Sequence, residues 1–259
     1  MVCFRIYFNC GAALLFGLAL APHSIAEQVN LAVASNFMKP MAVLQATFEQ
    51  QSGHRLVVSY GSSGRLYAQI VNGAPFDLFL SADAAKPQAL DAAGLTLTKP
   101  RVYATGRLVL WSRDARINID GLVALQDPKV TKIAMANPRI APYGLAARQV
   151  LENAKIYASV QSKLVLGENI SQAYQFAYTR SAQVGFVALS QVIEEVPETD
   201  YWIVPPQLHE PIHQSAVVLN RAKDNSAAKQ LFDFLLSGSA AKLIANFGYV
   251  PASSDEGDL

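Results

Sequence analysis

Cysteine is nearly absent from this chain of 259 residues. Its two cysteines, Cys3 and Cys10, both lie before residue 27, so residues 27–259 contain none. Disulfide bonds and cysteine-ligated metals are therefore excluded as the means by which that stretch is held together. It must be stabilised by a buried core, and it is long enough to form one large domain or two small ones.

Net charge is lacking as well. Lysine and arginine number 21 in total, and aspartate and glutamate number 20. Arg5 is the only charged residue among residues 1–26, so the charges of residues 27–259 balance. Nucleic acids are bound by strongly basic surfaces, and we therefore expect no nucleic-acid partner. If the chain binds an anion, it must do so through local geometry.

The apolar run near the N-terminus is too short to cross a membrane. It extends from Ala12 to Ala21, whereas a membrane-spanning helix needs about 20 residues. A basic residue, Arg5, precedes it, and the small residues Ser24 and Ala26 follow it. This order of features predicts a secretory signal peptide over residues 1–26.

The usual signatures of catalysis and of cation binding are missing too. There is no P-loop and no G-x-G-x-x-G. Ser63 is followed two positions later by Arg65 rather than by the glycine of a G-x-S-x-G elbow. His209 and His213 flank Pro211, which disfavours the helix that a zinc-binding pair at this spacing requires. An exported hydrolase that uses Ser63 stays open as a weaker alternative, and we expect no metal-cation ligands.

A strand-to-helix junction rich in small residues is the most informative feature present. The apolar stretch 56–60 predicts a strand, Gly61-Ser62-Ser63-Gly64 follows, and a helical pattern then runs to Asn72-Gly73. Such a junction collects free backbone N–H groups and the positive end of the helix dipole. The serine hydroxyls add donors, so the junction is suited to bind an anion. Alternatively, Ser63 only caps its helix.

A second junction of the same kind lies earlier in the chain. The predicted strand 29–34 is followed directly by Ser35 and Asn36, and then by a helical pattern that ends near Gly53. Two such junctions on neighbouring parallel strands would face one crevice, which is the usual ligand position in open α/β sheets.

Strands and helices alternate along the whole chain, which predicts an α/β fold with mostly parallel sheets. Further strands are predicted at 77–81, 107–111, 132–136, 184–189 and 216–219, with helices between them and two closing helices after residue 226.

Taken in order, several motifs of the chain resemble those of the periplasmic molybdate-binding proteins of ABC importers. The resemblance covers residues 29–250 and is carried by AVASNF, YGSSGRLYAQIVNGAPFDLFLSAD, ANPRIAPYG, GENISQ and QVGFVALSQ. It implies a type II periplasmic-binding-protein fold, in which two α/β lobes are joined by a hinge. Lobe one would comprise residues 27–105 and 215–259, and lobe two residues 106–214, with hinge strands near 103–108 and 211–216.

The resemblance also implies a set of ligand-binding residues. Ser35 and Ser63 match the two serine ligands of the family, while Tyr143 and Ile170 match positions that bind through backbone N–H groups. In one branch of the family a tyrosine hydroxyl adds a fifth contact, and this chain has Ala188 at that place. Asn36 and the hydroxyl of Tyr143 are candidate replacements. Ser62 is expected to point elsewhere.

The resemblance implies a periplasmic binding protein rather than an enzyme. It would capture molybdate or tungstate, deliver it to a membrane permease and act as a monomer without a cofactor. These dianions only accept hydrogen bonds, so a site made of donors without a carboxylate suits them. Another tetrahedral oxyanion, such as sulfate, is the alternative ligand, because the residues alone do not reveal the size of the cavity.

Overall fold

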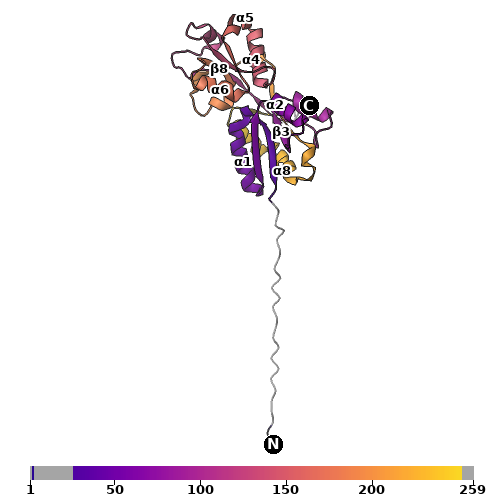
Figure 1. The fold of residues 1–259 in the computed structure, drawn as a ribbon. Helices are drawn as coiled ribbons and strands as arrows, with labels where there is room; N and C mark the ends of the chain where they lie inside the picture. Colours follow the sequence, from indigo (N-terminus) through magenta and orange to yellow (C-terminus); the bar gives the residue numbers. More distant parts are fainter. Residues whose placement is uncertain (1, 3–25, 253–259) are drawn as a thin grey trace.

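The computed structural model describes residue 2 and residues 26–252, so the rest of the predicted signal peptide and the acidic tail from residue 253 lie outside the described residues. The described chain folds into two bodies, each built on one sheet (Figure 1). The indigo N-terminal segment and the yellow C-terminal segment share one body, and the middle of the chain forms the other (Figure 1). The chain therefore passes between the bodies twice.

The first sheet has the strand order β11-β4-β10-β3-β1-β2. Its strands are β1 (Gln28–Ala34), β2 (Arg55–Gly61), β3 (Leu78–Ser81), β4 (Arg101–Gly106), β10 (Ile212–Val218) and β11 (Val250–Pro251).

The second sheet has the order β7-β6-β8-β5-β9. Its strands are β5 (Leu108–Trp111), β6 (Ile133–Ala136), β7 (Leu164–Gly167), β8 (Val184–Ala188) and β9 (Tyr201–Ile203).

Both sheets are mixed, which corrects the prediction of mostly parallel sheets while the two-lobe α/β fold is confirmed. Strands β1, β2 and β3 are parallel, and so are β6, β7 and β8. The pairings of β10 and of β5 are antiparallel. The cause is the double crossing. β4 leads out of the first sheet at Gly106, and β10 re-enters it at Ile212, so these neighbours run in opposite directions.

The crossings at 106–108 and at 204–211 form the hinge. The first lies within the predicted segment 103–108, and the second ends where the predicted segment 211–216 begins. The limits of the two lobes given above stay a prediction. Strand β10 belongs to the first sheet from Ile212 onward.

Helices cover both faces of each sheet. In the first lobe α1, α8 and α9 pack on one face, through residues such as Leu44, Leu231 and Ile244, while α2 and α3 pack on the other. No helix among the described residues is long and apolar enough to cross a membrane. The helices are α1 (Met38–Ser52), α2 (Ser63–Val71), α3 (Ala85–Ala92), α4 (Pro142–Asn153), α5 (Tyr157–Val160), α6 (Ile170–Tyr178), α7 (Leu189–Val192), α8 (Ser226–Leu235) and α9 (Gly238–Ala245).

Strand register brings the junctions together. Ala34 at the end of β1 pairs with Gly61 at the end of β2, so the segments that follow these two strands start side by side. In the second sheet Ala136 at the end of β6 pairs with Gly167 at the end of β7 in the same way. Each lobe thus presents two neighbouring helix N-termini at the carboxyl edge of its sheet.

Candidate functional site

One small cavity lies where these helix N-termini meet, and we call it the junction cavity. It leaves about 10 Å³ in which the centre of a water molecule can be placed. Both lobes contribute to its wall, and all five residues predicted as ligands line it. The lining residues are Ala34, Ser35, Asn36, Gly61, Ser62, Ser63, Ala82, Ala141, Pro142, Tyr143 and Ile170.

Ser63 opens α2 and is completely buried. Its Oγ accepts a 2.9 Å hydrogen bond from the backbone N–H of Ala82, which follows β3. A hydroxyl that accepts from a backbone N–H keeps its own proton available for another acceptor. The backbone N–H of Ser63 lies in the first turn of α2, where helical N–H groups lack an intrahelical partner. Ser63 is thus positioned by β3 to donate twice into the cavity.

Ser35 and Asn36 form a 3₁₀ turn, Ser35–Phe37, directly after β1, and both are buried. The side-chain amide of Asn36 donates to Gln214 Oε1 at 2.7 Å and to the hydroxyl of Tyr249 at 2.9 Å. Because both of its N–H bonds are used, this amide has no donor left for a ligand. Asn36 can therefore serve the cavity only through its backbone N–H.

Tyr143 is the second residue of α4, after Pro142 at the first helical position. Its ring is buried, and its hydroxyl packs against Gly106 at the first hinge crossing. A Cβ at Gly106 would lie 2.1 Å from that hydroxyl, so only glycine fits there. Tyr143 thus approaches the cavity with its backbone while its hydroxyl contacts the hinge, and the hydroxyl is poorly placed to replace a missing ligand.

Ile170 is the first residue of α6, and Asn169 caps that helix by accepting a 3.0 Å bond from the N–H of Gln172. Ala188, at the position where one branch of the family carries a tyrosine, does not line the junction cavity. Its own N–H donates to Gln191 Oε1 at 2.9 Å. Ala188 therefore offers the cavity neither a side-chain donor nor its backbone N–H.

The electrostatics of the junction cavity suit an anion. None of the residues that line it is acidic. Burial and the neighbouring hydroxyl of Tyr249 raise the pKa of Tyr143 well above its usual range, and burial raises the pKa of Tyr249 to about 12. Both phenols therefore stay neutral at physiological pH. Among the described residues, no cluster of three or more His, Cys, Asp or Glu side chains could hold a metal ion.

The two lobes touch around the cavity. The backbone N–H of Gly64 in α2 donates to the carbonyl of Ile140 in the other lobe at 2.9 Å. The hydroxyl of Ser171 in α6 donates to the carbonyl of Ser35 at 3.2 Å. Arg65 in α2 forms an ion pair across the cleft with Glu168. These contacts describe a closed arrangement.

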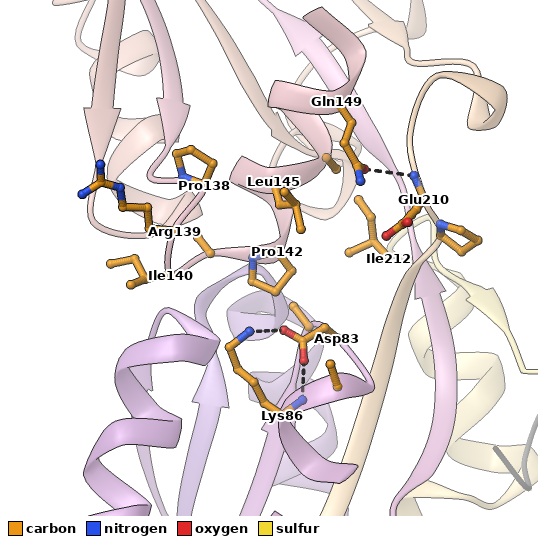
Figure 2. Close-up of a pocket in the computed structure, with 15 residues that line it drawn as sticks. Asp83, Lys86, Pro138, Arg139, Ile140, Pro142, Leu145, Gln149, Glu210 and Ile212 are labelled. Carbon is orange, nitrogen blue, oxygen red and sulfur yellow. Dashed lines mark hydrogen bonds and ion pairs between the residues drawn. The ribbon is translucent and has the colours of Figure 1, made fainter. Parts of the chain in front are cut away.

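A wider groove, the interlobe groove, adjoins the cavity and shares Ala82, Ala141 and Pro142 with it. Figure 2 shows Asp83 and Lys86 on one side of it and Arg139 on the other. Asp83 accepts from the backbone N–H of Lys86 at 2.9 Å and from its ammonium at 2.6 Å (Figure 2). The carboxylate of Asp83 is therefore neutralised by the ammonium of Lys86.

Sequence reasoning missed part of the site. Ser62, expected to point elsewhere, also lines the junction cavity. Gln214, Ser190 and Tyr249 were not singled out, although they surround Asn36: the hydroxyls of Ser190 and Tyr249 donate to its carbonyl at 2.9 and 3.0 Å. A glutamine in the middle of an apolar strand, as in Ile212–Val218, was the one available signal, because such a buried amide needs partners.

Comparison with known proteins places this geometry in a family. The family model described as bacterial extracellular solute-binding protein matches residues 29–250. The chain belongs to this family. One relative is the molybdate-binding protein ModA of Rhodobacter capsulatus, 43% identical over 92% of this chain and 93% of the relative. Another is ModA of Azotobacter vinelandii, 42% identical over 95% of this chain and 96% of the relative.

A solved structure agrees with these relatives. The periplasmic molybdate-binding protein of Azotobacter vinelandii superposes with a TM-score of 0.82 at 36% identity, covering 87% of this chain and all of that one. The resemblance seen in the sequence and the two-lobe fold are thereby confirmed. Members of this family bind solutes for transport, so the chain is a binding protein and not an enzyme, and the hydrolase alternative is dropped.

Proposed function

We propose that this protein captures molybdate or tungstate between its lobes and delivers the anion to the permease of an ABC importer. The single observation that carries the proposal is the convergence of Ser35, Asn36, Ser63, Tyr143 and Ile170 on one cavity. These residues come from four different strand-to-helix junctions. The relatives named for molybdate binding support the choice of ligand.

The physics of the cavity favours a fully deprotonated dianion. Molybdate and tungstate only accept hydrogen bonds, and the lining offers hydroxyl and backbone donors without a carboxylate. Each helix N-terminus contributes on the order of 0.3–1 kcal/mol, and more where it is partly buried. Protonated phosphate would also need an acceptor for its own hydrogen, and none of the proposed ligand residues is acidic.

The setting of the protein is part of the proposal. We propose that residues 1–26 direct export to the periplasm and are then removed, and that the mature protein works as a monomer without a cofactor. We propose that the first lobe comprises residues 27–105 and 215–259 and that the second comprises residues 106–214. Sulfate is the alternative ligand, and the size of the cavity decides between the two.

A thermal-shift screen of residues 27–259 against molybdate, tungstate, sulfate and phosphate tests the ligand. A ligand present at 100 times its Kd stabilises the folded state by about 2.7 kcal/mol, which raises the melting temperature measurably. We expect large shifts with molybdate and tungstate and a small one with phosphate. A shift with sulfate alone would move the assignment to a sulfate receptor, and no shift with any oxyanion would refute the proposal.

Calorimetry on Ser63→Ala tests the site. Losing a donor to a charged ligand costs about 1.5–3 kcal/mol, or about tenfold or more in affinity, and Ser35→Ala should behave alike. Ser81→Ala is the matched control. Ser81 is also completely buried and accepts a backbone N–H, from Asp83 at 3.3 Å, but it does not line the cavity. Equal affinities for Ser63→Ala and Ser81→Ala would remove Ser63 from the site.

A further inference from the structure

Ser62 occupies the N-cap position of α2 but does not cap the helix. An N-cap serine ordinarily accepts a hydrogen bond from a backbone N–H two or three residues later. Here the side chain makes no such bond. The residue is 3% exposed, and its Oγ has no hydrogen-bond partner among the described residues. A buried hydroxyl without a partner is costly, which calls for an explanation at each position where it occurs.

The position of Ser62 supplies that explanation. It lines the junction cavity between Gly61 and Ser63, at the N-terminus of a nine-residue helix. The hydroxyl of its neighbour Ser63 already accepts from the N–H of Ala82, whereas the hydroxyl of Ser62 has no hydrogen-bond partner in the described part of the chain. An unused donor and an uncapped helix N-terminus at the same cavity are both satisfied by one bound anion.

We infer that the hydroxyl of Ser62 donates a hydrogen bond to the bound oxyanion, as a ligand residue additional to Ser35 and Ser63. The inference rests on the proposed function, because it needs an oxyanion in the junction cavity. Ala188 has no side-chain donor, and both N–H bonds of the Asn36 amide are used for Gln214 and Tyr249. The hydroxyl of Ser62 replaces the donor that neither residue can give to the ligand. In this role the hydroxyl of Ser62 binds the ligand instead of capping α2.

The test compares Ser62→Ala with Ser215→Ala by calorimetry with molybdate, tungstate and sulfate. Ser215 is an equally suitable serine for control, since it is 1% exposed and its Oγ also lacks a partner, but it lies in β10 away from the cavity lining. We expect Ser62→Ala to weaken binding of the preferred oxyanion about tenfold. Ser215→Ala should stay within about twofold, and Ser62→Thr, which keeps a hydroxyl, should recover most of the affinity.

Melting of the ligand-free variants separates a ligand residue from a helix cap. Removing a cap lowers stability, whereas removing a hydroxyl that has no partner does not. We therefore expect the melting temperature of Ser62→Ala without ligand to equal or exceed that of the wild type, while its shift with the oxyanion shrinks. A lowered melting temperature together with unchanged affinity would overturn the inference in favour of a cap.

The outcomes for Ser62 and for the proposed function are distinguishable. If the wild type binds molybdate or tungstate and Ser62→Ala binds it as tightly as Ser215→Ala does, the inference about Ser62 fails and the proposed function stands. If the wild type binds none of the oxyanions, both fail.

Discussion

The side-chain amide of Asn36, at the junction cavity, donates a 2.7 Å hydrogen bond to Gln214 in the hinge strand β10. A second hydrogen bond of Gln214, within the hinge strand, fixes the direction of this bond. Gln214 Nε2 donates to the carbonyl of Ile212 at 2.8 Å, and because a carbonyl only accepts, Gln214 Oε1 must face Asn36. Gln214 and Asn36 are both buried, so the cavity and the second hinge crossing are joined by a buried polar contact.

Replacing Gln214 by Ala should harm both stability and binding. The change leaves one N–H of Asn36 and the carbonyl of Ile212 without these partners, at a cost of about 1–3 kcal/mol in the free energy of unfolding. It also releases Asn36 from its fixed orientation, so we expect molybdate affinity to fall about fivefold or more, which corresponds to about 1 kcal/mol. Urea unfolding and calorimetry measure the two effects.

Gln45→Ala is the control for this variant. Gln45 Nε2 also makes two hydrogen bonds, to Glu49 and to the carbonyl of Leu56, within the first lobe and far from the hinge. Its loss should lower stability without changing affinity. If Gln214→Ala destabilises the protein but binds as tightly as Gln45→Ala does, the contact between Gln214 and Asn36 has no part in binding.

Gly64→Ala should weaken binding by preventing closure. A Cβ at residue 64 would lie 2.8 Å from the carbonyl oxygen of Ile140 in the other lobe and 3.0 Å from its Cα. Both are backbone atoms, so the lobes would have to move apart, and we expect at least about tenfold weaker molybdate binding by calorimetry. The stability of the ligand-free protein should not fall, because alanine favours helix over glycine.

The matched control for Gly64→Ala is Gly238→Ala. Gly238 also lies in the first turn of a helix, α9, and a Cβ there would meet no atom within 4 Å. This variant should bind like the wild type. Full affinity in Gly64→Ala would mean that the contact between Gly64 and Ile140 is not needed in the bound state.

The core of each junction could be predicted from the sequence because its signals are local. A short apolar run followed by Gly61-Ser62-Ser63-Gly64 and a periodic helix predicts strand, turn and helix without tertiary information. Strand β1 and helix α1, with Gly53 in the left-handed conformation at its end, follow the prediction within a residue or two. Three strands went unpredicted, β7, β9 and β11, and each of them is short and not fully buried.

The surroundings of Asn36 could not be predicted, because they depend on contacts between residues far apart in the chain. Asn36 meets Gln214, Ser190 and Tyr249, each more than 150 residues away. No local pattern encodes such a contact. The antiparallel course of β10 was missed for a similar reason: strand direction is set by the second crossing of the hinge, whereas alternating strands and helices suggest parallel pairing.

The histidine pair should be dispensable for oxyanion binding. His209 and His213 line a separate, largely apolar pocket at the hinge, together with Leu108 and Val204, that shares no lining residue with the junction cavity. His213 Nδ1 lies 3.1 Å from Thr105 Oγ1, and His209 Nδ1 lies 2.7 Å from the carbonyl of Glu210. Changing both to Ala should leave molybdate affinity within about threefold, the size of a surface effect of about 0.5 kcal/mol. A large loss, or binding that requires a metal, would reveal a site at this pocket.

The last prediction concerns motion of the two lobes. Ser35 and Ser63 belong to the first lobe and Tyr143 and Ile170 to the second, so neither lobe alone can surround the anion. In the structure described here the lobes meet through Gly64 and Ile140 and through the 2.8 Å ion pair between Lys39 and Glu195. An anion must enter before these contacts form, so we expect the ligand-free protein in solution to populate a more open state.

Solution scattering with and without molybdate measures this motion, and the radius of gyration should decrease at saturation. Part of the binding energy is used to close the lobes, because a state that is only fractionally populated lowers the apparent affinity by that fraction. A variant that favours the closed state should therefore bind more tightly without any new contact to the ligand, and Gly64→Ala should show the opposite. If the radius of gyration is the same with and without ligand in the wild type, either the lobes are already closed without the anion or the site lies within one lobe, and the assignment of the site to both lobes fails.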